Sequence, residues 1–202
     1  MFQACLLWKK KKCQLPKISK EKGQIDIVAG MFCTILVLVV ILFGFRTVEY
    51  VITSAYVEDA LAASNLASGI VDLEEYGKTH IVQIKDPESA FLVYREALCH
   101  NLKLDEYLNT TNREMIAGKV EILDYMIFNV IGETVFVYKL DENGRVIEAC
   151  QEKTGEVQTP EGIFVENTTV YSRISFEVRG FGEQNIRAIK EKSIDIVRCE
   201  DE

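Results

Sequence analysis

The sequence has little of what marks an enzyme, a metalloprotein or a low-complexity chain. Its 202 residues include only 2 histidines and 3 prolines. The HExxH, CxxC, P-loop and GxSxG patterns are all missing, and with them the common signatures of metal, nucleotide and serine-hydrolase sites. With 12 glycines beside so few prolines, the chain is neither collagenous nor proline-rich. We therefore expect no enzyme activity, no catalytic residue, no metal site and no cofactor.

Negative charge is nearly absent from the first 22 residues, which hold seven lysines and one acid, Glu21. The other 180 residues carry 16 basic and 30 acidic side chains. An acidic body of this kind does not suit nucleic acid, because phosphate contacts require clustered cations. The charge pattern predicts a basic leader joined to an acidic body, with no nucleic-acid partner.

Charge of either sign is absent from residues 27–45, which have the sequence IVAGMFCTILVLVVILFGF. At about 1.5 Å per residue, a helix of this length matches the roughly 30 Å hydrocarbon core of a bilayer. A buried core helix is the alternative, but it is rarely apolar on every face. The run also exceeds the apolar core of about 7–15 residues in a cleaved secretory signal. It predicts one transmembrane helix, with the lipid bilayer as a partner.

The lysines predict the direction of this helix. All seven of the leader's lysines precede the apolar run, whereas only Arg46 follows it closely. By the positive-inside rule, the N-terminus stays in the cytoplasm and the C-terminal domain lies outside. We expect a single-pass protein of the cell membrane with an extracytoplasmic domain.

The junction before the apolar run, residues 20–27, has the sequence KEKGQIDI. An acid at the first turn of a helix is stabilised by the helix dipole, which is one explanation of Asp26. A basic leader that ends in glycine, followed by an acid and an apolar helix, also resembles the type IV pilin-like superfamily. The resemblance is to the minor pilins or pseudopilins of Tad-type (tight adherence) systems, and covers about residues 16–75.

This resemblance implies that a prepilin peptidase cuts after Gly23 and leaves Gln24 as the mature N-terminus. Asp26 would offset the free amino terminus of a neighbouring subunit and set the register of helix assembly. The family usually has glutamate at the fifth mature position, which is Val28 here. The implied function is that of a minor pilin or pseudopilin in a type IV or Tad-like pilus or secretion apparatus. Its partners would be other pilin-like subunits, bound through the N-terminal helix.

A helical pattern continues beyond the apolar run, because apolar residues recur there at intervals of mostly three or four. They are Val48, Val51, Ile52, Ala55, Ala62, Leu66, Ile70 and Leu73. Ser64 and Asn65 are among the polar residues at the other positions. With Gly77 as a plausible stop, one helix from Ile27 to about Leu73 is predicted. Its outer half would present an apolar stripe either to a domain or to sister helices.

Four segments follow from these patterns. They are a basic leader (1–23), a transmembrane helix (24–46), an amphipathic extension of that helix (47–77) and an extracytoplasmic α+β domain (78–202). The fold class is α+β, with a long, half-transmembrane N-terminal helix packed on a C-terminal antiparallel β-meander. The resemblance makes this arrangement pilin-like.

Within the domain, residues 80–84 are predicted as a short strand, and Asp86-Pro87 begins a helix that runs to about Asn101. Asn143-Gly144 predicts a tight hairpin turn. Alternation from Thr169 to Arg179 predicts a half-buried antiparallel strand. The other expected strands are 120–130, 133–140, 145–151 and 193–199.

Three cysteines, Cys99, Cys150 and Cys199, fall in the outer domain. An odd number allows one disulfide with a free thiol, or three reduced cysteines. Cys150 and Cys199 are slightly favoured as a pair, because both lie at predicted strand ends.

A different function, that of a membrane-anchored extracytoplasmic ligand-binding or sensory domain, is also consistent with the sequence. A sheet packed along the outer half of the long helix would favour the pilin hypothesis. A sheet standing apart from that helix would favour the sensor.

Overall fold

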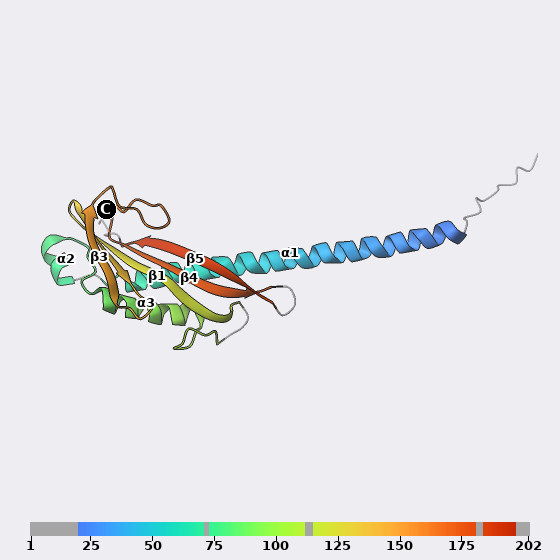
Figure 1. Ribbon diagram of the computed structural model, residues 1–202, viewed down its shortest axis with the longest axis horizontal. Helices are drawn as coiled ribbons and strands as arrows, with labels where there is room; N and C mark the ends of the chain where they lie inside the picture. The colour runs from blue at the N-terminus through green and yellow to red at the C-terminus, as the bar shows by residue number, and fades with distance from the viewer. Residues whose placement is uncertain (1–19, 71–72, 112–114, 181–183, 197–202) are drawn as a thin grey trace, which may run out of the picture. The chain divides into compact units, whose positions relative to one another are not determined.

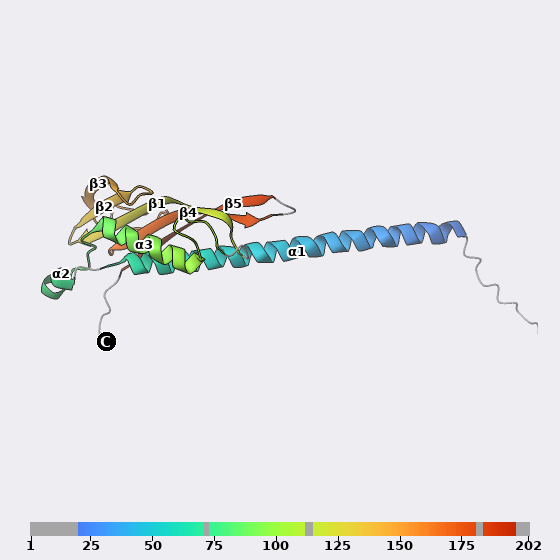
Figure 2. The same ribbon diagram turned by 90° about the horizontal axis from the view of Figure 1, so that it is seen from below.

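The computed structural model describes residues 20–70, 73–111, 115–180 and 184–196. Its contacts divide the chain into two units, Met1–Phe45 and Arg46–Glu202. The described part of the first unit is helical throughout. The second unit contains a five-stranded antiparallel sheet with helices on one of its faces (Figure 2). The chain is therefore α+β, as the sequence predicts, with a long apolar helix at the N-terminal end.

Helix α1 spans Lys20–Ser68 and ends earlier than predicted. The prediction carried it to about Leu73, with Gly77 as its stop, but the chain leaves the helix at Gly69. Glycine has a low helix propensity, and here it also allows a close approach. A Cβ at Gly69 would lie 2.5 Å from the side chain of Ile196. Residues Leu73–Thr79 form a separate short helix, α2, which contains Gly77.

Helix α3 spans Pro87–Leu102, in agreement with the predicted helix. Oδ1 of Asp86 accepts hydrogen bonds from the backbone N–H groups of Glu88 and Ser89, both at 3.1 Å. Pro87 occupies the first helical position, where a missing N–H costs nothing. The buried face of the helix consists of Ala90, Phe91, Tyr94, Leu98 and Leu102.

The sheet consists of β1 (Ala117–Ile131), β2 (Thr134–Leu140), β3 (Val146–Lys153), β4 (Thr169–Arg179) and β5 (Asn185–Asp195). The strand order is β3-β2-β1-β4-β5, so the predicted simple meander is wrong beyond β3 (Figure 1). The connection 154–168 carries the chain from the β3 edge to the other side of β1. The last strand begins at Asn185, well before the predicted 193.

The turn between β2 and β3 has the chemistry that the sequence predicts. Oδ1 of Asp141 accepts hydrogen bonds from the backbone N–H groups of Asn143 and Arg145, at 2.9 and 2.8 Å. Gly144 has φ +80°, which L side chains rarely adopt. A Cβ at Gly144 would also lie 2.4 Å from Cδ1 of Phe91, so the turn can pack against α3 only with glycine there.

Residues 81–83 do not form the predicted strand, and Ile84 makes only an isolated bridge. The buried amide of Asn129 binds both backbone groups of Ile84 instead. It accepts from Ile84 N–H at 2.9 Å and donates to Ile84 C=O at 2.8 Å. A side chain thus replaces a neighbouring strand, so the alternation of residues 80–84 does not lead to sheet pairing.

The main core lies between one face of the sheet and the helices α1 and α3 (Figure 2). A smaller cluster lies on the other face, where Val157 and Val165 of the 154–168 connection cover Phe128, Val135 and Tyr171. Tyr171 is therefore buried, although the sequence predicts one exposed face for β4. Ser175 is also buried, and its hydroxyl accepts a hydrogen bond from Nε of Arg187 on β5 at 2.7 Å.

Candidate functional site

The described residues contain no group of three or more His, Cys, Asp and Glu side chains placed to hold a metal ion. His80 and His100 are both exposed; His80 follows α2, and His100 lies in α3. Burial raises the pKa of the Cys99 thiol, and slight burial with nearby glutamates raises that of Cys150. Reactive cysteines have lowered pKa values, so neither thiol resembles an activated nucleophile. The best-defined functional element of the described chain is helix α1.

The N-terminal part of α1 has a surface that suits lipid. From Ile27 to Phe45 every side chain is exposed, and none of the most apolar stretch is buried inside the protein. The hydroxyl of Thr34 donates to the carbonyl of Gly30 at 2.9 Å, so this polar group is satisfied within the helix itself. Within the described residues, α1 is the one helix long and apolar enough to cross a membrane.

The site residues predicted from the family resemblance lie near the start of α1. Gly23, Gln24 and Asp26 are all helical, and the Asp26 side chain is exposed. The helix begins at Lys20, so Asp26 is nearly two turns inside it. Dipole stabilisation fades within the first turn, so the dipole of the helix as described, from Lys20 on, adds little at Asp26. Leader residues 1–19 lie outside the described residues.

The predicted disulfide stays a prediction. Cys150 lies exposed on β3, an edge strand of the sheet, and Cys199 lies outside the described residues.

The outer part of α1, residues 46–68, packs on the sheet through one face. Its buried residues are spaced by one, three or four, so they share one side of the helix. They are Thr53, Val57, Ala60, Leu61, Ser64, Asn65 and Ser68. More than half of these are polar or alanine, which is unusual for a helix face in a core.

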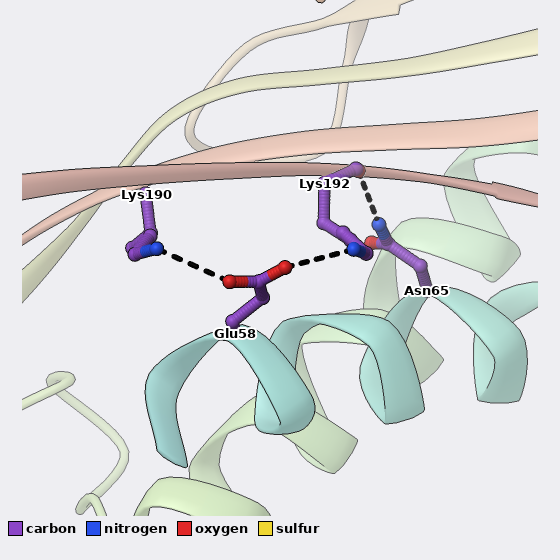
Figure 3. A network of polar contacts seen from close by, with 4 residues as sticks. All are labelled: Glu58, Asn65, Lys190 and Lys192. Atoms are coloured by element: carbon purple, nitrogen blue, oxygen red, sulfur yellow. Dashed lines mark hydrogen bonds and ion pairs between the residues drawn. The ribbon is translucent and has the colours of Figure 1, made fainter. Parts of the chain in front are cut away.

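Buried polar groups on this face are hydrogen-bonded to the sheet. Asn65 is fully buried. Its Nδ2 donates to the backbone carbonyl of Lys192 at 2.8 Å, and the Ser172 hydroxyl donates to its Oδ1 at 2.7 Å (Figure 3 shows the first of these). One turn on, the hydroxyl of Tyr125 donates to Ser68 Oγ at 2.9 Å. Losing one partner would leave another buried group unpaired, at a cost of roughly 1–3 kcal/mol.

Helix α3 binds the same part of α1 through Asn101. Its Nδ2 donates to Ser64 Oγ at 3.2 Å, and the Tyr56 hydroxyl donates to its backbone carbonyl. The Ser64 hydroxyl in turn donates a hydrogen bond to the carbonyl of Ala60 at 2.6 Å. The outer part of α1 is therefore held between the sheet and α3 by polar contacts as well as by the core.

A carboxylate on α1 lies between two lysines of β5 (Figure 3). Glu58 pairs with Lys190 at 3.1 Å and with Lys192 at 2.8 Å. Hydrogen bonds from Lys192 and then Lys190 lower the pKa of Glu58, and the same contact raises the pKa of Lys192. The Glu58 side chain is 39% exposed, so each pair is worth only about 0.2–1 kcal/mol.

The face of α1 opposite the sheet is apolar and exposed. We call it the outward stripe; it comprises Val48, Val51, Ile52, Ala55, Asp59, Ala63 and Leu66 of the helix, with Ile70 just beyond the helix end at Ser68. Leu66 is 60% exposed, and Val51 is 58% exposed. Within this stripe Asp59 is the one exposed charge. The sequence left open whether this stripe meets a domain or sister helices. Its residues are exposed, and Ile52 at one end of it lines a cavity with Met115 and Val178 of the domain.

The sequence analysis missed the residues that dock α1 on the sheet. It placed Ser64 and Asn65 on the polar side of the helix, away from any core. The available signal was their spacing with Val57, Leu61 and Ser68, which a purely hydrophobic pattern discards. The ion-pair partners of Glu58 could not be predicted from the sequence, because the two lysines lie 132 and 134 residues further along the chain.

Comparisons of this chain with protein families, curated proteins and solved structures gave no match.

The lowered pKa of Glu58 predicts how its contribution to stability depends on pH. The contribution is complete above the unfolded-state pKa of about 4.3 and is lost as the pH falls through the lower native pKa. Glu58→Gln should therefore cost about 1 kcal/mol or less at pH 7, and the difference from wild type should vanish in acid. Urea unfolding of the detergent-solubilised chain between pH 7 and pH 3 measures this difference.

Asp59→Asn is the matched control for this prediction, because Asp59 is the next residue of the helix but lies in the outward stripe. Its unfolding curves should follow wild type at every pH. A Glu58→Gln deficit that stays constant down to pH 3 would contradict the assigned role of the two lysine contacts.

Proposed function

We propose that this chain is a single-pass membrane protein that acts as a minor pilin or pseudopilin subunit in a type IV or Tad-like apparatus. Its inner helix would be held in the bilayer, and the subunits would assemble through α1. The observation that carries the proposal is the docking of α1 by its polar face. This docking leaves the outward stripe free to pack against the helix of another subunit.

Burial of the outward stripe would supply the driving force for assembly outside the bilayer. Burying apolar surface yields about 25 cal/mol per Å², so a leucine such as Leu66, 60% exposed, gains about 1–2 kcal/mol in an interface. Val51, Ile52 and Ile70 are exposed to a similar degree. Ala55 and Ala63, which lie between them, would let two helix backbones approach closely.

Cleavage after Gly23 would give Asp26 the role that the pilin resemblance implies. In the uncut chain Asp26 lies well inside α1, which begins at Lys20. In a chain that begins at Gln24, the same carboxylate is the third residue and lies in the first turn. There it would be close to the positive end of the helix and available to the amino terminus of a neighbouring subunit.

A ligand-binding or sensory function is the second candidate. A cavity of about 870 Å³ beside α3, lined by Leu92, Arg95 and Tyr107 among others, favours it. This volume is in the usual range for small-molecule sites. The sheet, however, packs along the outer part of α1 and does not stand apart from it, and this arrangement favours the pilin proposal.

The processing step is tested by the N-terminus of the mature protein. Mass spectrometry of the chain extracted from membranes of its native host should show a form that begins at Gln24. Gly23→Val should leave the leader attached, because the residue before the cut would then be branched. An intact leader in the wild-type protein would contradict the pilin part of the proposal and leave the membrane anchor standing.

The orientation is tested with Cys150, which is exposed on β3. In a variant whose other five cysteines are replaced by serine, a membrane-impermeant maleimide should label Cys150 in intact cells. The reaction is best run above pH 8, because the pKa of this thiol is raised. A variant that keeps only Cys5 should be labelled after lysis alone, and the reverse result would invert the topology.

Introducing a negative charge into the outward stripe tests whether this stripe is the assembly surface. In a cysteine-free background, Ala63→Cys should form disulfide-linked dimers in membranes. Adding Leu66→Glu should reduce the amount of dimer at least about tenfold, because a tenfold change corresponds to a lost contact of about 1.4 kcal/mol. Leu92→Glu is the matched control, because Leu92 is also 60% exposed but lies on α3. Both glutamates should leave the urea midpoint nearly unchanged. Equal loss of dimers in the two variants would reject the stripe as the interface.

A further inference from the structure

A second cavity, of about 300 Å³, opens beside the first residues of the larger unit. Two arginines, Arg46 of α1 and Arg179 at the end of β4, line it together with Glu49. Its apolar lining comes from Ile52, Met115 and Val178. The cavity therefore combines two guanidinium groups with an apolar wall.

Its charge is unbalanced in favour of the arginines. Arg46 pairs with Glu49 at 2.6 Å, but both side chains are substantially exposed, at 43% and 60%. Exposed pairs of this kind are weak and exchange readily with other partners. Arg179 makes no ion pair with any residue that the structure describes. Among its described lining residues the cavity thus has one more positive charge than negative, and it has room for an anion.

Chain connectivity places this cavity next to the end of the apolar run. Arg46 is bonded directly to Phe45, the last uncharged residue of that run. If residues 27–45 cross the bilayer, Arg46 must lie at the level of the lipid headgroups on the far side. Phospholipid phosphates lie at this level, and arginine binds phosphate oxygens through a two-donor fork.

We propose that this cavity binds the phosphate group of an anionic phospholipid. Arg46 and Arg179 would donate to its oxygens, while Ile52, Met115 and Val178 would contact the glycerol and the first acyl carbons. An inorganic phosphate would use the arginines but gain nothing from the apolar wall. The site would bind the domain to the membrane surface at a second point. This inference depends on the membrane-spanning part of the proposed function.

The test uses the full-length chain in detergent, with native mass spectrometry of bound lipid. Phosphatidylglycerol should be retained in preference to phosphatidylcholine. Arg179→Gln should weaken the retained binding about fivefold, which corresponds to roughly 1 kcal/mol per arginine near a lipid surface. Arg145→Gln is the matched control, since Arg145 is an exposed arginine on the β2–β3 turn and away from the cavity. It should bind phosphatidylglycerol as wild type does.

Four outcomes would overturn the proposal. Equal binding by Arg179→Gln and wild type would reject the site. Displacement of the lipid by equimolar glycerol 3-phosphate would assign the cavity to free phosphate compounds. Release of the wild-type chain from membranes by alkaline carbonate would remove the membrane anchor and this site with it. A chain that resists carbonate but shows no preference for phosphatidylglycerol would reject the site and leave the proposed function intact.

Discussion

The rotation of α1 about its own axis decides which of its faces another molecule can meet, and the buried amide of Asn65 fixes that rotation. Hydrophobicity alone does not set this rotation, because Val51, Ile52 and Leu66 on the outward stripe are as apolar as Val57 and Leu61 on the face that meets the sheet. Turning the outward stripe towards the sheet would leave Ser172, which is fully buried, without the acceptor that it has at 2.7 Å. One unpaired buried group costs about as much as burying one leucine gains, and the buried Asn65 makes two contacts that this turn would break.

The charged contacts contribute little stability, but they help to fix the position of α1 along the sheet. Glu58 reaches two lysines on β5, and both are on the strand that also supplies the carbonyl for Asn65. Sliding α1 by one turn would break all of these contacts together. Polar groups of this type are best known for fixing register, and here they fix the helix against the edge strand of the sheet.

The parts of the fold that depend on local signals could be predicted from the sequence. Helix α3 follows from Asp86, Pro87 and the spacing of its apolar face, and β4 follows from strict alternation. The order of the strands could not be predicted, because the 154–168 connection has no pattern that shows where it leads. β5 was largely missed, since Arg187, Lys190 and Lys192 make it resemble an exposed loop until their acidic partners Glu121 and Glu58 are known.

The same distinction applies to the candidate site. Gly23, Gln24 and Asp26 were identified because they are close together in the sequence and resemble a family motif. The docking face of α1 was not, because a serine–asparagine pair inside a helix indicates burial only when its partners are known. Those partners are 107 and 127 residues away, in β4 and β5. The apolar stripe was found, but the sequence could not say that the domain would leave it uncovered.

Charge repulsion between two copies opposes their association at a distance, whereas the outward stripe acts only on contact. The body after the leader is strongly acidic, so two copies repel each other at a distance, but salt screens this repulsion beyond about 8–10 Å. Burial of Leu66, Val51 and their neighbours acts only on contact. Membrane anchoring would bring the helices into contact, because confinement in one plane raises their local concentration and aligns them. In the proposed assembly the stripe would therefore depend on the apolar run of the same helix, which would hold the subunits in one membrane.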